Sequence, residues 1–281
     1  MNAVSEEKQL QLLLQGVDIP PCPAVLIALD AELKKDAPDQ RDIVRLVSKD
    51  VALSGQLMRI ANSPAFSGGH KLTSILQALN VLGTQQIFNL LVSQLMKAAL
   101  SDSSGISMDR FWESSAQTAN LSAELARRLR CVRPDVAYTF GLFHDCGIPL
   151  IMKRFPQCRE VLAEANATEE LKFTEVEDRA LGTNHAVVGY FLARRWHLPD
   201  FVSEGILHHH DYSVLANPGR VSDDARGLIA ICVLAEHIIR LHNQGDGEHE
   251  WAKAASAACQ FFQLSLGAVD DLIEDMLEWL A

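Results

Sequence analysis

Histidines are concentrated where their side chains could act together. A His–Asp pair, His144–Asp145, lies in the apolar stretch 140-FGLFHDCGIPLI-151, and a run of three histidines, 208-HHH-210, follows later. Burying an ionised carboxylate is costly unless it is paired or bound to a metal. The His–Asp pair therefore predicts either a metal site or a hydrogen-bonded polar network inside the protein.

Helical phase indicates which of these histidines face the interior. His185 begins a stripe at helical spacing that continues through Val188, Gly189, Leu192 and Trp196. Val202 and Ile206 lead at the same spacing into His209 and His210, whereas His208 falls toward the rim. Ligands from three separate helices would converge and suit Mn, Fe, Ni or Zn. The predicted metal ligands are His144, Asp145, His185, His209 and His210. Alternatively, these groups form a polar network in which Asp145 accepts hydrogen bonds from the imidazoles.

Helices are the elements that must position these side chains. Apolar residues recur at helical spacing almost throughout, for example Leu121, Leu125 and Leu129. The alternation of apolar and polar residues that is typical of strands is nearly absent. We therefore expect an all-α fold.

Polar and small residues mark the expected boundaries along the chain. The segment 101-SDSSGISMD-109 separates an N-terminal helical lobe from a second lobe that ends near residue 213. The polar loop 216-ANPGRVSDDARG-227 then precedes C-terminal helices expected over about 227–243 and 251–280.

Composition excludes several classes of protein. The net charge of -11 argues against a nucleic acid as partner, because proteins that follow a nucleic-acid backbone present a basic face. The N-terminus is acidic where a secretory signal would be basic, and no apolar run has the length of a membrane span. The six cysteines form no C-x-x-C pair and are expected to be reduced thiols. These features predict a cytoplasmic protein without a membrane partner.

Six segments, taken in order, resemble the HDOD domain, a bacterial signalling offshoot of the HD-type metal-dependent phosphohydrolases. They are 48-SKDVALSGQLMRIANSPAF-66, 74-SILQALNVLGTQQIFNLL-91, 111-FWESSAQTANLSAELA-126, 141-GLFHDCGIPLI-151, 177-EDRALGTNHAVVGYFLARRWHLP-199 and 206-ILHHHD-211. The resemblance implies an HD-domain-like helical bundle with an N-terminal lobe. It covers residues 17–213, divided into 17–100 and 105–213. Residues 214–281 are then expected to be a helical extension packed on the HD-like lobe.

The resemblance also implies an altered set of metal ligands. In HD phosphohydrolases the ligands are a first His, the His–Asp dyad and a later Asp, and binuclear relatives add further histidines. The first His aligns with Ser114, which shares a helix face with Leu121 and Leu125, and the nearest carboxylate to the later Asp is Glu236. Because serine is a poor ligand for these metals, we expect a stand-alone, non-catalytic signalling module that acts on a protein partner in trans. The alternative is a metal-dependent phosphohydrolase acting on a nucleotide or another phosphate ester.

Overall fold

The computed structural model of the chain describes residues 12–63, 71–101, 108–243 and 249–280. Every regular element in these ranges is a helix, which confirms the prediction of an all-α fold. The helices are α2 (Ala24–Leu33), α3 (Gln40–Ser48), α4 (Val51–Ala61), α6 (Ile75–Leu82), α7 (Thr84–Ser101), α8 (Asp109–Leu129), α9 (Pro134–Phe143), α10 (Ile148–Arg154), α11 (Cys158–Ala167), α12 (Phe173–Leu181), α13 (His185–Arg195), α14 (Asp200–His208), α15 (Ser213–Ala216), α16 (Asp223–His242), α17 (His249–Phe262) and α18 (Leu266–Leu280).

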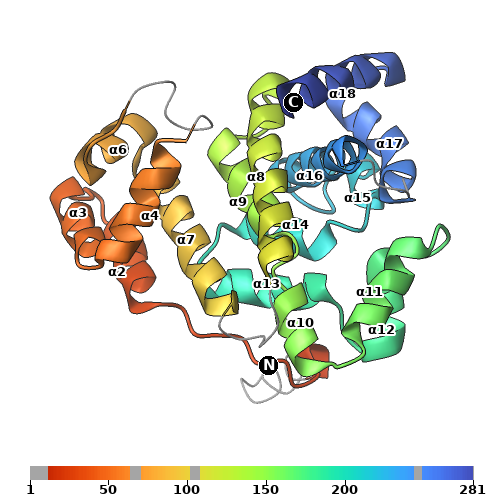
Figure 1. Ribbon diagram of the computed structural model, residues 1–281, viewed down its shortest axis with the longest axis horizontal. Coiled ribbons are helices and arrows are strands. Elements are labelled where there is room, and N and C mark those ends of the chain that lie inside the picture. Colours follow the sequence, from red (N-terminus) through yellow and green to blue (C-terminus); the bar gives the residue numbers. More distant parts are fainter. Residues whose placement is uncertain (1–11, 64–70, 102–107, 244–248, 281) are drawn as a thin grey trace.

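Local sequence signals fix the helix ends in the N-terminal lobe, which contains α2, α3, α4 and α6 (Figure 1). The side chain of Asp39 caps α3, and the side chain of Asp50 accepts a hydrogen bond from the backbone N–H of Leu53 at the start of α4. Gly83 ends α6 with a φ of 83°, a conformation that glycine adopts without steric cost. The chain therefore turns sharply from α6 into α7.

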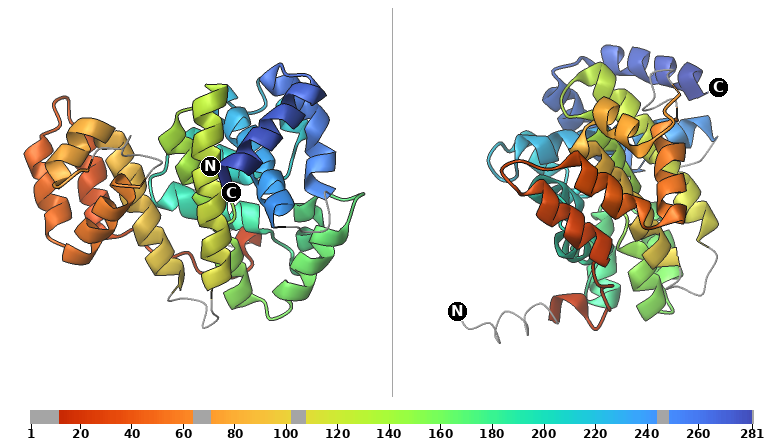
Figure 2. Two further views of the ribbon diagram at one scale, coloured as in Figure 1. Left: turned by 45° about the horizontal axis from the view of Figure 1, so that its top comes forward. Right: turned by 90° about the vertical axis from the view of Figure 1, so that its left-hand side faces the viewer.

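Helix α7 connects the two lobes. It packs against α2, α4 and α6 on one side and against α9 and α10 on the other. Figure 2 shows the N-terminal lobe beside the larger second lobe, with α7 running between them. Within the described ranges, none of the helices alone has both the length and the apolar character of a membrane span. Only α6 and α7 taken together pass that test, and they are bent by 118° at their junction.

The second lobe is built around an antiparallel pair, α8 and α9. Arg130 ends α8 in a left-handed conformation, and Pro134 begins α9. Helix α16 packs against α8, α9 and α14, and α13 packs against α10 and α14. The largest fully buried side chains in this lobe are aromatic, namely Trp196, Phe140 and Phe143. This packing brings the ends of α9, α13 and α14 to one place.

The C-terminal helices differ in part from the expectation. Helix α16 begins at Asp223, and the helix expected over 251–280 is two helices, because Gln263 has a left-handed φ of 56° between α17 and α18. Most of the expected acidic loop and of the segment 101–109 lies outside the described residues. The division of the chain at residue 213 stays a prediction.

Candidate metal centre

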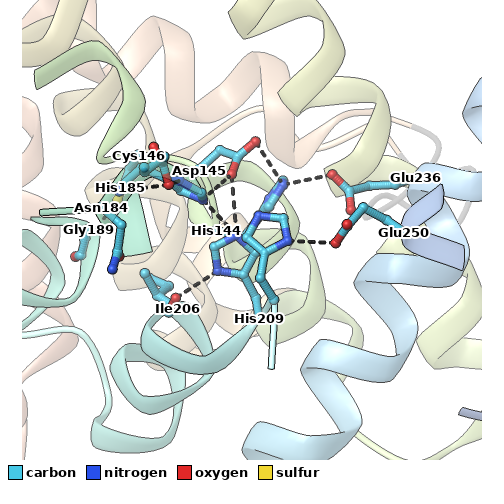
Figure 3. A network of polar contacts seen from close by, with 12 residues as sticks. His144, Asp145, Cys146, Asn184, His185, Gly189, Ile206, His209, Glu236 and Glu250 are labelled. Carbon is cyan, nitrogen blue, oxygen red and sulfur yellow. Dashed lines mark hydrogen bonds and ion pairs between the residues drawn. The ribbon is translucent and has the colours of Figure 1, made fainter. Parts of the chain in front are cut away.

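The predicted ligands lie together in the second lobe, where four helix ends meet (Figure 3). His144 follows the last residue of α9, and Asp145 lies in the turn before α10. His185 is the first residue of α13, where the side chain of Asn184 caps the helix by accepting from Val187 N–H. His209 and His210 follow the last residue of α14. His144, His185 and His209 are buried, whereas the Asp145 side chain is 25% exposed.

One group of donor atoms is formed by Asp145, His185, His209 and His210. One ligand atom from each lies within 4.8 Å of the others. Asp145 Oδ1 is 3.2 Å from His185 Nε2 and 3.4 Å from His209 Nε2. The two Nε2 atoms are themselves 3.1 Å apart. Three imidazoles and a carboxylate at this spacing are a donor set typical of Zn, Fe, Ni or Mn.

Each of the four clustered imidazoles is held through its Nδ1 atom by an acceptor. Their N–O distances are 3.0 Å for His144 to Gly141 O, 2.5 Å for His185 to Glu177 Oε2, 2.7 Å for His209 to Ile206 O, and 2.8 Å for His210 to Glu250 Oε2. Carbonyl and carboxylate oxygens only accept, so every Nδ1 carries the proton. Histidines that ligate metals are held in this way by outer partners that fix the tautomer and the ring orientation.

This proton assignment tests whether the residues fit a cation. With every Nδ1 protonated, neutral imidazoles would direct bare Nε2 lone pairs of His144, His185 and His209 at Asp145, and those of His185 and His209 also at each other. Acceptors facing each other at 3.1 Å require either a shared proton or a cation between them. The donor set therefore fits a divalent metal. Without a metal, a proton on Nε2 of His185 would satisfy the facing acceptors.

The pKa values of the group follow from burial and from the charges that face each other. Burial works to raise the pKa of Asp145, but the imidazoles of His144, His185 and His209 hold it well below its usual range. Burial works to lower the pKa of His185, but Glu177 and Asp145 raise it to about 10. Burial and the neighbouring His210 lower the pKa of His209 to about 3. Burial works to lower the pKa of His144, but Cys232, Asp145 and Glu236 raise it well above its usual value. In the absence of metal, His144 and His185 thus carry positive charge and His209 is neutral.

Two outer carboxylates were not identified from the sequence as site residues. Glu177 is fully buried, with 0% of its surface exposed to solvent. Glu250, on α17, also accepts hydrogen bonds from the Tyr212 hydroxyl at 2.7 Å and from Lys253 Nζ at 2.8 Å. Burial works to raise the pKa of Glu250, but His210 and Lys253 lower it. The signal that could have revealed Glu177 is its place among the buried residues Phe173, Val176 and Leu181 of α12.

A second group of donor atoms lies on the other side of Asp145. One ligand atom each from His144, Cys232 and Glu236 lies within 4.8 Å of the others. His144 Nε2 is 3.0 Å from Glu236 Oε1 and 3.4 Å from Asp145 Oδ2. Glu236, the carboxylate nearest to the later Asp of the resemblance, therefore lies beside the dyad, whereas Cys232 was expected only to be a reduced thiol. Burial raises the pKa of the Cys232 thiol to about 11. All six cysteines are free.

The prediction that Ser114 faces inward is wrong. Ser114 is exposed, and Ser115 is buried with its hydroxyl donating to Phe111 O at 2.8 Å. A Cβ added to Gly141 would meet Thr118 and Ala119, so these residues of α8 and α9 lie side by side. Helices α8 and α9 run in opposite directions. His144 lies about one helical turn after Gly141 on α9, and Ser115 lies about one turn before Thr118 and Ala119 on α8, so Ser115 is level with the dyad. Ser115 thus occupies the inward position.

A cavity of about 130 Å³ opens beside both groups of donors. Asp145, His210 and Glu236 contribute to its wall, together with Arg240 and Trp251. Glu236 is one-third exposed, so water and ions reach the donors from this side.

Comparison with known proteins places the chain in a family. The family model of the HDOD domain matches residues 19–212. A curated protein of Treponema pallidum (strain Nichols), described as "Uncharacterized protein", is 26% identical over 249 residues. This alignment covers 88% of the chain but 46% of the relative, so the chain spans about half the length of that protein.

Solved structures share the fold. An HDOD domain protein with unknown function from Geobacter sulfurreducens aligns with a TM-score of 0.69 and 25% identity, covering 97% of this chain and 94% of that one. A protein of Shewanella amazonensis SB2B, described as a "putative phosphohydrolase", aligns with a TM-score of 0.69 and 22% identity, covering 94% of each chain.

Proposed function

The chain belongs to the HDOD domain family, and we propose that it is a regulatory module of bacterial signal transduction whose second lobe binds a divalent transition metal. The ion would be held by Asp145, His185, His209 and His210, and the module would act through contacts with a protein partner. Mn, Fe, Ni and Zn all suit imidazole and carboxylate donors.

The observation that carries this proposal is the common orientation of the imidazoles. All four clustered rings donate through Nδ1 to a fixed acceptor, and the Nε2 atoms of His144, His185 and His209 face Asp145. A polar network alone would not require the same nitrogen of each ring to be protonated. Outer partners of this kind are typical of metal ligands, because they fix the ring and raise its basicity.

Two features favour a regulatory role over turnover. The resemblance aligns the first histidine of HD phosphohydrolases with Ser114, and neither the exposed Ser114 nor the buried Ser115 is a strong metal ligand. The cavity of about 130 Å³ is also smaller than the roughly 300–1,000 Å³ typical of sites that enclose small organic ligands. A nucleotide therefore does not fit inside the cavity as it stands.

Helix α13 offers a physical route from the centre to the N-terminal lobe. His185 begins this helix, and at its other end Trp196 Nε1 donates to Pro20 O at 3.1 Å while Arg195 donates to Ile19 O at 3.0 Å. The segment containing Ile19 and Pro20 leads directly into α2. Occupancy of the centre would thereby bias the position of the N-terminal lobe, which supports a signalling role.

Hydrolysis of a phosphate ester is the second candidate function. Arg240 lines the cavity beside Asp145 and Glu236, where a guanidinium would bind phosphoryl oxygens. A bound metal would lower the pKa of a coordinated water and polarise the phosphoryl group. The small cavity would restrict the reaction to a small ester or to a phosphate group that enters from solvent.

The test is the metal content of protein purified without a histidine tag, measured by elemental mass spectrometry. We expect at least about one equivalent of a transition metal in the unaltered protein, a loss of most of it in His209→Gln, and no loss in His208→Gln. His208 is the matched control because it is a half-buried neighbour outside the donor group.

A protein that binds none of the four metals, even after incubation with each, would overturn the proposed metal centre. If the metal-loaded protein hydrolyses a panel of small phosphate esters, and His209→Gln does not, the second function replaces the first. If the protein binds metal but hydrolyses none of these esters, the regulatory function stands.

A further inference from the structure

An open groove of about 500 Å³ lies in the second lobe, where α8 ends, α9 begins and the start of α16 lies beside them. Positive charge is concentrated here, because the stretch 127-RRLRCVR-133 places four arginines within seven residues of a chain whose net charge is -11. Arg127, Arg130 and Arg133 line the groove, together with the acidic Asp224. The groove is therefore a basic site on an acidic protein. None of the described residues that line it also lines the cavity at the metal centre.

The three arginines of the groove differ in how they are held. Arg133 donates to the buried carboxylate of Asp135 from two nitrogens, at 2.7 and 3.1 Å. Arg127 pairs with Glu124, about one turn earlier on α8. The Arg130 side chain is exposed, and its guanidinium has no hydrogen-bond or ion-pair partner within the described ranges. Because a guanidinium presents five N–H donors in a planar fork, Arg130 is available to bind an anion.

The backbone of Arg130 shows that arginine is not the residue that the fold prefers there. Its φ is 55°, and its N–H donates to Ala126 O at 2.9 Å where α8 ends. Glycine is the usual residue in this left-handed conformation, because a Cβ is crowded in it. Arg127 and Arg128 already place positive charge in the last turn of α8, where it interacts favourably with the helix dipole. A bound anion would give the Arg130 side chain a role that the fold does not.

Two helices lead from the groove toward the metal centre. Helix α9 begins at Pro134, and His144 follows it about 15 Å further along. Helix α16 begins beside the groove and carries Glu236, which lines the cavity at the centre. A Cβ added to Gly227 would lie 2.8 Å from Val132 Cγ1, so the turn between α8 and α9 packs closely on α16. An occupant of the groove would therefore contact two of the helices that position donors at the centre.

We propose that this groove binds an acidic segment of the protein partner. Carboxylates of the segment would bind the guanidinium groups of Arg130 and Arg127, since arginine and carboxylate form paired, charge-assisted hydrogen bonds. An apolar side chain of the segment would lie on Val132 and Pro134, which also line the groove. The inference rests on the proposed function, because it names the surface through which the regulatory module acts, but it does not require a bound metal.

Acidic residues around the groove favour a short acidic segment over a long polyanion. Asp223 at the start of α16 is 85% exposed, and Asp275 on α18 is 63% exposed and lies 3.0 Å from Arg128. Glu124 and Asp224 add further carboxylates beside the arginines. A nucleic acid or an anionic membrane would bring additional phosphates against these carboxylates, and like charges repel. A peptide can place neutral residues at those positions, so a protein is the better-matched partner.

The experiment measures binding of short fluorescein-labelled peptides to the full-length protein by fluorescence anisotropy. One panel surrounds a leucine, valine or phenylalanine with glutamates, and a matched panel has glutamine in place of every glutamate. We expect acidic peptides to bind about tenfold or more tightly than their glutamine counterparts, with an affinity that falls as salt is raised. Arg130→Gln and Arg130→Gly should weaken this binding by about tenfold, because a hydrogen bond to a charged group contributes a factor of about that size. Arg59→Gln, which alters an exposed arginine on α4, is the control and should bind like the unaltered protein.

Arg130→Gly separates a loss of binding from a loss of folding. Glycine suits the left-handed backbone at this position, so the variant should unfold at the same or a higher urea concentration than the unaltered protein. Weaker peptide binding by a variant of unchanged or raised stability would assign the binding to the guanidinium.

The peptides are tested against both metal-free and zinc-loaded protein, so that failure of the groove and failure of the metal centre are distinguishable. Arg130-dependent binding by a protein that takes up no metal would support the groove and contradict the proposed centre. Absence of Arg130-dependent binding, whether or not metal is taken up, would overturn the groove. Equal binding of the glutamine peptides would also overturn it, as would tighter Arg130-dependent binding of single-stranded DNA or of phosphatidylglycerol vesicles.

Discussion

Glu177 is a fully buried carboxylate whose contribution can be measured through the histidine that it holds. Its Oε2 accepts from His185 Nδ1 at 2.5 Å and from the backbone N–H of His185 at 3.4 Å. Replacing such an outer partner typically lowers metal affinity by about 10–100-fold. We expect Glu177→Gln to weaken zinc binding by a factor in this range, measured by competition with a chelator of known affinity. Glu175→Gln, on the same helix, is the control. Equal affinities for the two variants would assign Glu177 a purely structural role.

Helical phase alone located most of the buried histidines, since His185 and His209 lie on apolar stripes of their helices. It failed at Ser114, because Leu121 and Leu125 mark the edge of the buried arc of α8, whose centre is formed by Ser115 and Ser122. Ser114 lies at the same edge near the start of α8, where the helix is exposed. Cys232 and the outer carboxylates could not be assigned in advance, because their roles depend on contacts between helices distant in the sequence.

The crossing of α13 with the start of α10 positions His185 opposite Asp145. Gly147 lies at this crossing, and a Cβ added there would lie 2.0 Å from the backbone oxygen of His185. Because backbone cannot move aside as a flexible side chain does, Gly147→Ala should lower the free energy of unfolding by about 3 kcal/mol or more. It should also weaken metal binding, because the two helices must separate. Urea denaturation and the zinc competition assay would measure the two effects.

Gly55 offers a matched control for the Gly147→Ala substitution. It lies within α4, and nothing is found within 4 Å of a Cβ added there. Gly55→Ala should raise the free energy of unfolding by about 0.5–1 kcal/mol, because alanine favours the helix. A similar loss of stability in both variants would show that the close crossing at Gly147 is not the cause. Periodicity predicted the helices, but such crossings follow only from the packed structure.

The two donor groups and their outer partners come from more than the segment that matches the family. The family model ends at residue 212, yet α16 supplies Cys232 and Glu236, and α17 supplies Glu250. Helix α16 also covers α8, α9 and α14, so removing residues 214–281 would expose their apolar faces. We expect this deletion to abolish the cooperative thermal transition, measured by calorimetry. A retained cooperative transition would instead show that 214–281 is a separable extension.

The pH dependence of stability depends on the charges of the whole centre. In the metal-free protein the pKa of His185 is about 10, against about 6.5 for an unfolded histidine. The free energy that protonated His185 contributes to folding is therefore fully present below about pH 6.5 and is lost as the pH rises toward 10. The pKa of His209 is about 3, so its contribution is present above about pH 6.5 and lost as pH falls toward 3. Considering these two groups, the melting temperature of the metal-free protein should be highest near pH 6.5.

Zinc competes with the proton on His185, so the two equilibria are linked. Raising the pH removes that proton and strengthens metal binding. The rise in melting temperature on adding a fixed excess of zinc should therefore be larger at about pH 8 than at about pH 6, measured by scanning fluorimetry after removal of metal by a chelator. In His185→Gln this difference should shrink, because the group that exchanges a proton for the metal is gone. A zinc effect equal at both pH values in the unaltered protein would contradict the assignment of the charge to His185. It would then favour a centre in which the imidazoles are already neutral without metal.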